Sequence, residues 1–453
     1  MSGHLISSDR QRIVVGLGKT GLACARWLYR AGTPFRVVDT RANPPGLDEL
    51  QRECPGVEVV CSPLDAELLS TADELIVSPG LSLKEPAIAA AIEAGAKVVG
   101  DIELFCREVT APIVAITGSN GKSTVTTLVG LMAEKAGVRV GVGGNIGLPV
   151  LEMLEQGEKD LYVLELSSFQ LETTHSLRAK AATVLNVTPD HMDRYASLVE
   201  YHQAKHRIYR GCEGAVYNRD DARTTPLIPE AVNVLSFGTG RPPGLKDFGL
   251  LTEDGETWLV QGLEKLLPVS EMKIRGQHNY ANAMAALALG SLAGLPMMAM
   301  LDALREFPGL AHRCEWVADI NGVGWFNDSK ATNEGATVAA IEGLGIGLTG
   351  KIILIAGGDG KGADFTELKP SVQRYVKDVL VMGVDGPRLA EAVGSVAPVQ
   401  RVVDMADAVA KAKALATEGD IVLLAPACAS FDMFDGFEHR GAVFREQVEA
   451  LHG

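Results

Sequence analysis

Residues 115–124, Ala-Ile-Thr-Gly-Ser-Asn-Gly-Lys-Ser-Thr, combine the residue types that hold the phosphates of ATP. Two glycines allow backbone N–H groups to approach the phosphates, the lysine can reach the terminal phosphate, and the serine or threonine after it can offer a hydroxyl to Mg²⁺. The candidate residues are Gly118, Ser119, Asn120, Gly121, Lys122, Ser123 and Thr124. We therefore predict an ATP site in this loop.

The loop is shorter than the most common phosphate-binding pattern, G-x-x-x-x-G-K-[ST]. That pattern needs glycine at position 116, where this chain has Ile116. The plainer alternative is a glycine–lysine turn in front of a surface helix. We favour the nucleotide site because an apolar strand, 112–116, precedes the loop and a helical pattern follows it, as phosphate binding at a helix N-terminus requires.

A second glycine motif, Gly16–Gly21, directly follows a predicted strand at 13–15, and Asp39 ends the next strand. This is the dinucleotide-binding fingerprint, in which the acid binds a ribose. Alone, the motif would favour an NAD-dependent oxidoreductase, but such an enzyme has no use for a separate ATP loop. A second, nucleotide-bearing substrate accounts for both motifs, and a tight turn without a ligand is the remaining alternative.

Two further side chains are suited to a divalent ion near the ATP loop. Glu165 ends the apolar run 161–164, and His191 follows the apolar run 183–186. The carboxyl ends of parallel strands meet at one edge of a sheet, so both side chains are expected on the edge that carries the ATP loop. Lys205 lies in a helical pattern, where a single lysine usually faces solvent.

The elements that position these residues fall into three blocks, in which short Val/Ile-rich runs alternate with helical patterns. This alternation predicts parallel sheets wound by helices, and 453 residues suit three domains. The fold class is α/β, with a Rossmann-like first domain, a central P-loop ATPase-type domain and a Rossmann-like third domain. We predict domain boundaries at 1–100, 101–306 and 307–453.

The predicted elements within the blocks can be placed approximately. The first block has strands near 12–17, 35–39, 57–60, 74–78 and 97–100. The second has strands at 161–165 and 182–186 and helices at 197–210 and 281–293. The third has a hairpin at Asn321-Gly322 and strands at 351–356, 377–382 and 420–425.

Composition excludes several classes of protein. The formal charge of −15, without clustered Lys and Arg, argues against nucleic-acid binding. The seven cysteines are scattered and form no C-x-x-C pair, which predicts reduced thiols, no zinc site and a cytoplasmic location. No run of 18 apolar residues and no signal-peptide pattern occurs, so neither membrane insertion nor secretion is expected.

Taken together, the motifs resemble those of the Mur ligase family over nearly the whole chain. The segments that carry the resemblance are Thr117–Thr124, Gly144-Asn145, Glu165–Glu172, Asp190–Tyr195, His278–Asn282, His312-Arg313, Asn327–Asn333 and Gly357–Lys361. The combination is far more specific than any one loop. The resemblance implies an ATP-dependent amide ligase that adds D-glutamate to UDP-N-acetylmuramoyl-L-alanine through an acyl phosphate, in peptidoglycan precursor synthesis.

The resemblance also implies roles for individual residues. The UDP substrate would contact Gly18, Thr20, Asp39, Thr40, Arg41, Ser78, Gly80, Asn145 and Ser167. ATP would contact the phosphate loop and Asn279, Asn282, Arg313, Asp328 and Lys330. D-Glutamate would contact Asp190, Arg313, Thr332, Lys361, Ser430 and Phe437. Two Mg²⁺ sites would use Ser123, Thr124, Glu165, His191 and Lys205, the last as an N-carbamate, and Lys122, Glu165, His191 and Lys205 would be catalytic.

Three alternatives stay open at this point. One is an NAD-dependent oxidoreductase with a degenerate second loop. Another is a nucleotide-sensing module without turnover, which would have no reason to assemble Glu165, His191, Lys205 and Arg313. The third is a related amide ligase, such as a sibling Mur ligase or a folylpolyglutamate synthase. The chain lacks the D-N-P-R sequence of the diaminopimelate-adding sibling, which favours D-glutamate. We expect a monomer.

Overall fold

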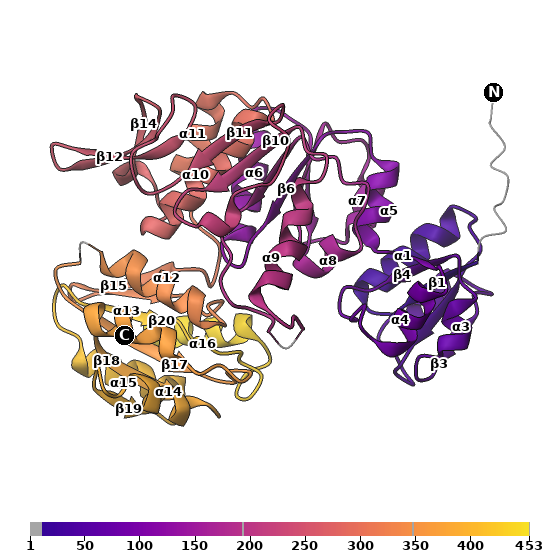
Figure 1. Ribbon diagram of the computed structural model, residues 1–453. Coiled ribbons are helices and arrows are strands. Elements are labelled where there is room, and N and C mark those ends of the chain that lie inside the picture. The colour runs from indigo at the N-terminus through magenta and orange to yellow at the C-terminus, as the bar shows by residue number, and fades with distance from the viewer. Residues whose placement is uncertain (1–10, 193, 347, 453) are drawn as a thin grey trace.

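The computed structural model describes residues 11–192, 194–346 and 348–452. Four sheets and their helices form three α/β units in chain order (Figure 1). The first ten residues of the predicted first domain, and Asp193 within the motif 190–195, lie outside this description. The three-domain α/β fold predicted from the alternation of strands and helices is confirmed.

The N-terminal unit is a five-stranded parallel sheet in the order β3-β2-β1-β4-β5. Its elements are β1 (Arg12–Val15), α1 (Lys19–Arg30), β2 (Arg36–Asp39), α2 (Leu47–Glu53), β3 (Val59–Cys61), α3 (Ala66–Ser70), β4 (Glu74–Val77), α4 (Pro86–Glu93) and β5 (Lys97–Val99). Each predicted strand is found, shorter by one or two residues, and the third is shifted from 57–60 to 59–61.

The central unit contains a six-stranded parallel sheet in the order β11-β10-β9-β6-β8-β7. Its elements are α5 (Asp101–Glu108), β6 (Ile113–Thr117), α6 (Lys122–Lys135), β7 (Val140–Gly144), α7 (Val150–Met153), β8 (Leu161–Glu165), α8 (Ser168–Glu172), β9 (Ala181–Val184), α9 (Leu198–His206), β10 (Gly214–Asn218) and β11 (Asn233–Phe237). An antiparallel sheet follows, with β12 (Phe248–Glu253), β13 (Glu256–Gln261) and β14 (Glu264–Pro268), and then α10 (Gln277–Leu292) and α11 (Met297–Glu306). The small antiparallel sheet was not foreseen from the sequence.

The C-terminal unit is a six-stranded sheet in the order β15-β16-β20-β17-β18-β19, parallel except for β15. Its elements are β15 (Glu315–Ile320), β16 (Val323–Asn327), α12 (Glu334–Gly345), β17 (Ile352–Gly357), α13 (Lys369–Tyr375), β18 (Val376–Met382), α14 (Gly386–Val393), β19 (Val399–Arg401), α15 (Met405–Leu415), β20 (Ile421–Leu424) and α16 (Phe437–Glu449). The predicted hairpin joins β15 to β16. Its Asn321 and Gly322 both have positive φ, 54° and 75°, as a type I′ turn requires.

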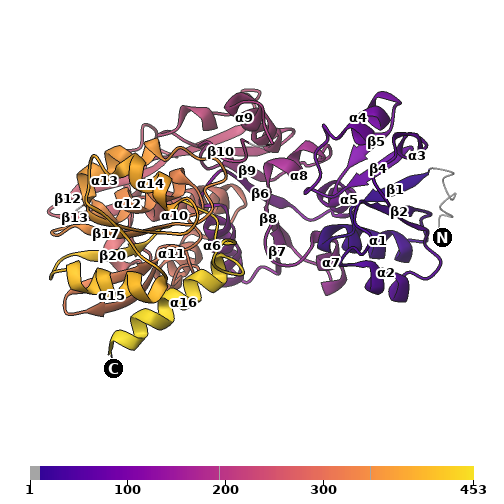
Figure 2. The ribbon, with the colours of Figure 1, turned by 90° about the horizontal axis from the view of Figure 1, so that it is seen from below.

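The core explains how the units hold together. β6 is buried along its whole length, as expected for a central parallel strand covered on both faces. One face packs against α6, α10 and α11. The other shares a continuous apolar cluster with α1 of the N-terminal unit, through α5 and α7 (Figure 2). In the described part of the chain, no helix is both long and apolar enough to cross a membrane.

Candidate active site

The phosphate loop joins β6 to α6, and its two glycines adopt backbone conformations that suit glycine. Gly118 has φ 157° and Gly121, at the N-cap of α6, has φ 82°. A Cβ atom on Gly121 would lie 2.5 Å from Oδ1 of Asn282, and one on Gly118 would lie 3.0 Å from Cβ of Leu185. The backbone therefore passes closer to its neighbours than a side chain would allow.

A side chain that the sequence analysis missed, Asn186, holds this loop. Its Oδ1 accepts the N–H of Asn120 at 2.8 Å, and its Nδ2 donates to the carbonyl of Asn120 at 3.0 Å. Its own carbonyl accepts the N–H of Ser119 at 3.0 Å. Asn186 lies two residues after the end of β9, the strand beside β6, so a polar residue near that strand end was the available signal.

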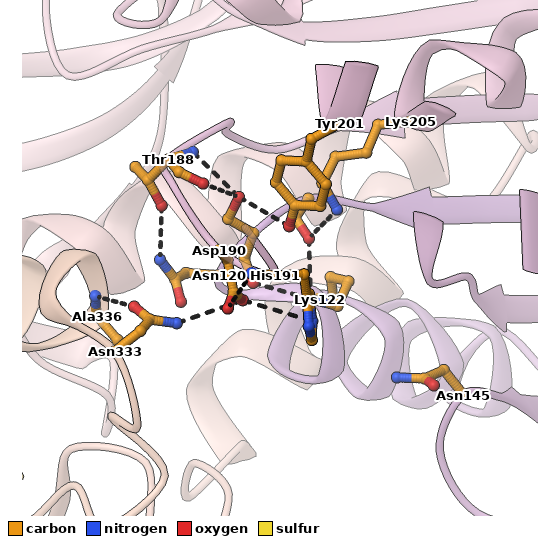
Figure 3. Close-up of polar contacts among 12 residues, drawn as sticks. Asn120, Lys122, Asn145, Thr188, Asp190, His191, Tyr201, Lys205, Asn333 and Ala336 are labelled. Atoms are coloured by element: carbon orange, nitrogen blue, oxygen red, sulfur yellow. Dashed lines mark hydrogen bonds and ion pairs between the residues drawn. The ribbon is translucent and has the colours of Figure 1, made fainter. Parts of the chain in front are cut away.

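Two lysines converge on the loop from different helices (Figure 3). Lys122 Nζ donates to the carbonyls of Gly118 and Ser119, both at 2.8 Å, and Lys205 Nζ donates to the carbonyl of Gly118 at 2.8 Å. Lys205 is only 1% exposed and lies 4.3 Å from the ring centroid of Tyr201. Burial, and then the charge of Lys122, lowers the pKa of Lys205 well below its usual value. Lys205 is thus a buried amine, and the expectation of a solvent-facing lysine from its helical pattern is wrong.

Oxygen atoms gather at the start of α6. Ser123 Oγ donates to Oε2 of Glu165 at 2.6 Å, and Asn145 Nδ2 donates to Oε1 of the same carboxylate at 2.9 Å. Arg313, from the C-terminal unit, donates through Nη2 to Ser123 Oγ at 2.7 Å. Burial lowers the pKa of Lys122, which stands beside this group. The C-terminal unit therefore reaches directly into the phosphate loop of the central unit.

Asp190 and His191 form a second contact between these units. Asn333 Nδ2 donates to Oδ2 of Asp190 at 3.5 Å, and the N–H of His191 donates to Oδ1 at 3.0 Å (Figure 3). His191 has φ 55°, and its ring centroid lies 4.9 Å from that of Phe169. The segment after β9 thus carries two polar groups to the edge where the loop and Glu165 already lie.

These groups line one cleft of about 390 Å³ between the central and C-terminal units. Most of the predicted catalytic, metal and D-glutamate residues share its wall. The predicted site residues that line this cleft are Ser119, Asn120, Gly121, Lys122, Ser123, Asn145, Glu165, Ser167, Asp190, His191, Lys205, Arg313, Lys330, Thr332 and Lys361. Residues from three separate segments of the C-terminal unit thus face the phosphate loop.

A neighbouring cleft of about 270 Å³ continues from the loop between α10 and α12. The predicted site residues in its wall include Thr124, Asn279, Asn282, Arg313, Asp328 and Lys330. Asp328 is buried, which raises its pKa to about 6, and Cys314 Sγ donates to its Oδ2 at 3.4 Å. Cys314 and His278 also line this cleft, although no role was predicted for either of them.

Two predicted D-glutamate residues lie differently. Ser430 is 2% exposed and does not line either cleft as described. Phe437 begins α16, and its ring centroid lies 3.9 Å from Nζ of Lys330, which lines both clefts. Phe437 therefore contacts the site through Lys330, and the D-glutamate role of Ser430 stays a prediction.

The N-terminal unit has a cleft of its own, about 350 Å³ in volume, beside its glycine turn. It is lined by Gly18, Thr20, Asp39, Thr40, Arg41, Ser78 and Gly80, all predicted for the UDP substrate. Arg41 Nη2 lies 2.7 Å from Oδ2 of Asp39, and the N–H of Leu17 donates to that oxygen at 2.6 Å. Burial raises the pKa of Asp39, but these hydrogen bonds outweigh it and lower the pKa to about 2.

Comparison with known proteins decides what kind of enzyme this arrangement represents. Residues 10–100 match the family described as Mur ligase MurD-like, N-terminal domain, residues 116–290 the Mur ligase middle domain, and residues 312–428 the Mur ligase, glutamate ligase domain. The chain belongs to the Mur ligase family. Mur ligases are ATP-dependent, so the ligase class is confirmed over the oxidoreductase and the sensing module.

Full-length relatives of this Mur ligase support the same conclusion. It is 58% identical over 447 residues, 99% of each chain, to the UDP-N-acetylmuramoylalanine–D-glutamate ligase of Pseudomonas aeruginosa. It is 54% identical over 99% of its length to that of Marinobacter nauticus, 100% of which is covered. The solved MurF ligase of Thermotoga maritima in complex with ADP has TM-score 0.62 at 16% identity, with 99% of this chain and 97% of that chain covered. A pseudomurein peptide ligase of Methanothermus fervidus has TM-score 0.62 at 17% identity, over 98% and 100%. These two structures show the shared fold.

Proposed function

We propose that this Mur ligase joins D-glutamate to UDP-N-acetylmuramoyl-L-alanine at the expense of ATP, in peptidoglycan precursor synthesis. The observation that carries the proposal is the 58% identity, over 99% of both chains, to a ligase named for this reaction. Three features of the molecule support the proposal: the cleft beside the N-terminal glycine turn, the phosphate loop, and the cationic side chains of the C-terminal unit that face this loop.

Each substrate has a matching region. ATP would place its phosphates on the loop beside Lys122 and its nucleoside in the cleft between α10 and α12, with Asn279, Asn282, Asp328 and Lys330. The UDP group would occupy the N-terminal cleft, and the muramoyl-alanine would extend toward Asn145 and Ser167. D-Glutamate would bind to Asp190, Arg313, Thr332 and Lys361. All of these groups come from one chain, so we expect a monomer, and we propose a cytoplasmic location because ATP and the UDP substrate are nucleotides.

The chemistry proceeds in two steps. A carboxylate oxygen of the alanine attacks the γ-phosphorus of ATP, the bond to the β-phosphate oxygen breaks, and an acyl phosphate and ADP form. The amine of D-glutamate then attacks the acyl carbon, loses a proton, and the tetrahedral intermediate expels phosphate to leave the amide. Two anions repel each other in the first step, so the cations Lys122 and Arg313 stabilise its transition state.

The residues at the loop suit Mg²⁺, which prefers oxygen ligands and is often held by one or two carboxylates together with substrate phosphates. Glu165 and Ser123 offer such oxygens 2.6 Å apart. No group of three His, Cys, Asp or Glu side chains that could hold a metal by itself occurs among the residues described. When bound, Mg²⁺ would neutralise phosphate charge. We propose two sites, using Ser123 or Thr124 with Glu165 and using His191 with Lys205.

Lys205 can serve a cation only after chemical change, because an ammonium repels Mg²⁺. Its buried amine has a lowered pKa, and a neutral amine is the form that adds CO₂ and releases a proton to give a carbamate. The carbamate is anionic and presents oxygen atoms, which a hard cation prefers. We therefore propose that Lys205 acts as its N-carbamate.

The products test the function directly. With the UDP substrate, D-glutamate and Mg²⁺, purified enzyme should release ADP and phosphate in equal amounts and form the amide, as followed by chromatography and phosphate assay. Formation of AMP and pyrophosphate would contradict the acyl-phosphate route. L-Glutamate should react poorly, because a site that fixes both carboxylates presents only one enantiomer's amine to the acyl carbon. Equal rates with both enantiomers would contradict the D-glutamate assignment.

A further inference from the structure

Arg194 reaches from the central unit to the loop that lines the N-terminal cleft. Its Nη1 donates to the carbonyls of Pro79 at 3.1 Å and Gly80 at 3.2 Å, and its Nη2 donates to the carbonyl of Leu81. These three residues follow β4 and form part of the wall of the cleft proposed for UDP. A single guanidinium therefore holds three successive carbonyls of that wall.

The other side of the same guanidinium touches the catalytic cleft. Its central carbon lies 4.2 Å above the ring centroid of Phe169. Phe169 lines the cleft that contains the phosphate loop, and its ring packs 4.9 Å from His191 and 5.8 Å from Tyr195, centroid to centroid. Figures 1 and 2 both place α8, which carries Phe169, on the side of the central unit that faces the N-terminal unit. Arg194 thus connects the walls of the two clefts.

We propose that Arg194 is a positioning residue that fixes the nucleotide cleft relative to the catalytic cleft. The inference rests on the proposed function, in which one substrate binds at its UDP end in the first cleft and must present a carboxylate in the second. A misplacement of about 1 Å at the reacting end can cost roughly 100-fold in rate. The planar fork of arginine donates in fixed directions and stacks on an aromatic ring at once, which lysine does not.

The test measures three Michaelis constants and kcat for Arg194→Ala and Arg194→Lys. Both variants should raise KM for the UDP substrate about tenfold and lower kcat about tenfold, while KM for ATP and for D-glutamate stays within about twofold. Arg178→Ala is the matched control, because Arg178 also donates to backbone carbonyls, of His175 and Leu177, but within its own unit. The control should leave all four constants unchanged.

Each outcome separates the proposal from its rivals. If lysine restores native constants, Arg194 acts through its charge, and the positioning role is wrong. Native constants in Arg194→Ala, or a parallel rise in all three KM values with a lowered Tm, would equally overturn it. Should the alanine variant not fold, Phe169→Leu removes the other half of the contact and must show the same selective rise in KM, of about threefold. Failure of the native enzyme to use the UDP substrate would instead refute the proposed function.

Discussion

The two glycine loops of this protein share a strand–loop–helix arrangement, but we propose different chemistry for them. Both connect a buried parallel strand to a helix, at residues 16–21 and 118–121, and both border a cleft. In the N-terminal loop the helix packs tightly on the turn, since a Cβ on Gly21 would lie 1.8 Å from the carbonyl oxygen of Gly16. In the central loop the tight contacts come from α10 and from the segment after β9.

The charges around the loops differ more than their backbones do. Beside the N-terminal loop, Asp39 is already paired with Arg41. Beside the central loop, the cations Lys122 and Arg313 line the same cleft as the buried carboxylate Glu165. A loop flanked by a neutral pair can hold a nucleotide unchanged, whereas a concentration of cations stabilises charge that develops during phosphoryl transfer. The surroundings, and not the glycine motif, separate a binding loop from a catalytic one.

The largest effect is expected from removing the cation of the catalytic loop. Lys122→Ala should lower kcat by about 1,000-fold, because the Lys122 amine contacts two carbonyls of the phosphate loop and would meet the transferred phosphate. Thermal unfolding should change little, since the side chain bonds only to its own loop. Lys135→Ala, at the far end of α6, is the control, because its salt bridge to Glu306 lies at the surface. Loss of activity together with a collapsed unfolding transition would leave the catalytic role unsupported.

Variants of Lys205 test whether the second lysine at that loop works as an anionic carbamate. Lys205→Ala should lower kcat by about 100-fold, and added formate should restore part of the activity by supplying carboxylate oxygens. The same formate should not rescue Lys122→Ala, which lacks a cation. Because CO₂ adds to the neutral amine, activity at low CO₂ should fall as the pH decreases and the amine becomes protonated. Fully active enzyme with an unmodified Lys205 by mass spectrometry would exclude the carbamate.

Substituting alanine for one glycine in each loop tests how strictly each loop requires glycine. Gly121→Ala forces a positive φ on alanine, at about 1–2 kcal/mol, and places its Cβ against Asn282. We expect KM for ATP to rise about tenfold, corresponding to roughly 1.4 kcal/mol. Gly18→Ala has φ −89°, and its Cβ would meet no other described atom within 4 Å, so its Tm should match the native value. Equal destabilisation by both changes, in calorimetry, would contradict this difference.

The smallest effect concerns the charged pair beside the N-terminal loop. The folded pKa of Asp39 is lowered to about 2, below the value of about 3.9 in an unfolded chain. The pair therefore contributes stability above about pH 4, on the order of 1 kcal/mol because solvent screens the half-exposed Arg41, and this stability is lost as the pH falls through 2. Urea unfolding between pH 6 and pH 3 should show a difference between native enzyme and Asp39→Asn that shrinks toward acid. A difference independent of pH would show that the charge is not responsible.

Much of the fold was determined by local sequence pattern. Valine and isoleucine runs such as 74–77 and 352–357 are strands because both faces of a parallel sheet are buried, and the Asn321-Gly322 turn follows from positive φ at both positions. The phosphate loop could be predicted because its functional residues are consecutive in the sequence. The strands of the small sheet at 248–268 were missed, since their boundaries depend on pairing with one another.

The sequence by itself therefore determined the family, the three-domain α/β fold and the loop that we propose holds ATP. Only the tertiary structure decided which distant groups meet that loop. Lys205 is buried because α9 packs against α8 and because its amine meets the carbonyl of Gly118 in the phosphate loop, whereas helical periodicity alone predicted a solvent-facing lysine. Asn186, Arg313 and Arg194 act across gaps of up to 190 residues. Such contacts depend on how whole sheets are placed, and no local pattern of residues encodes that placement.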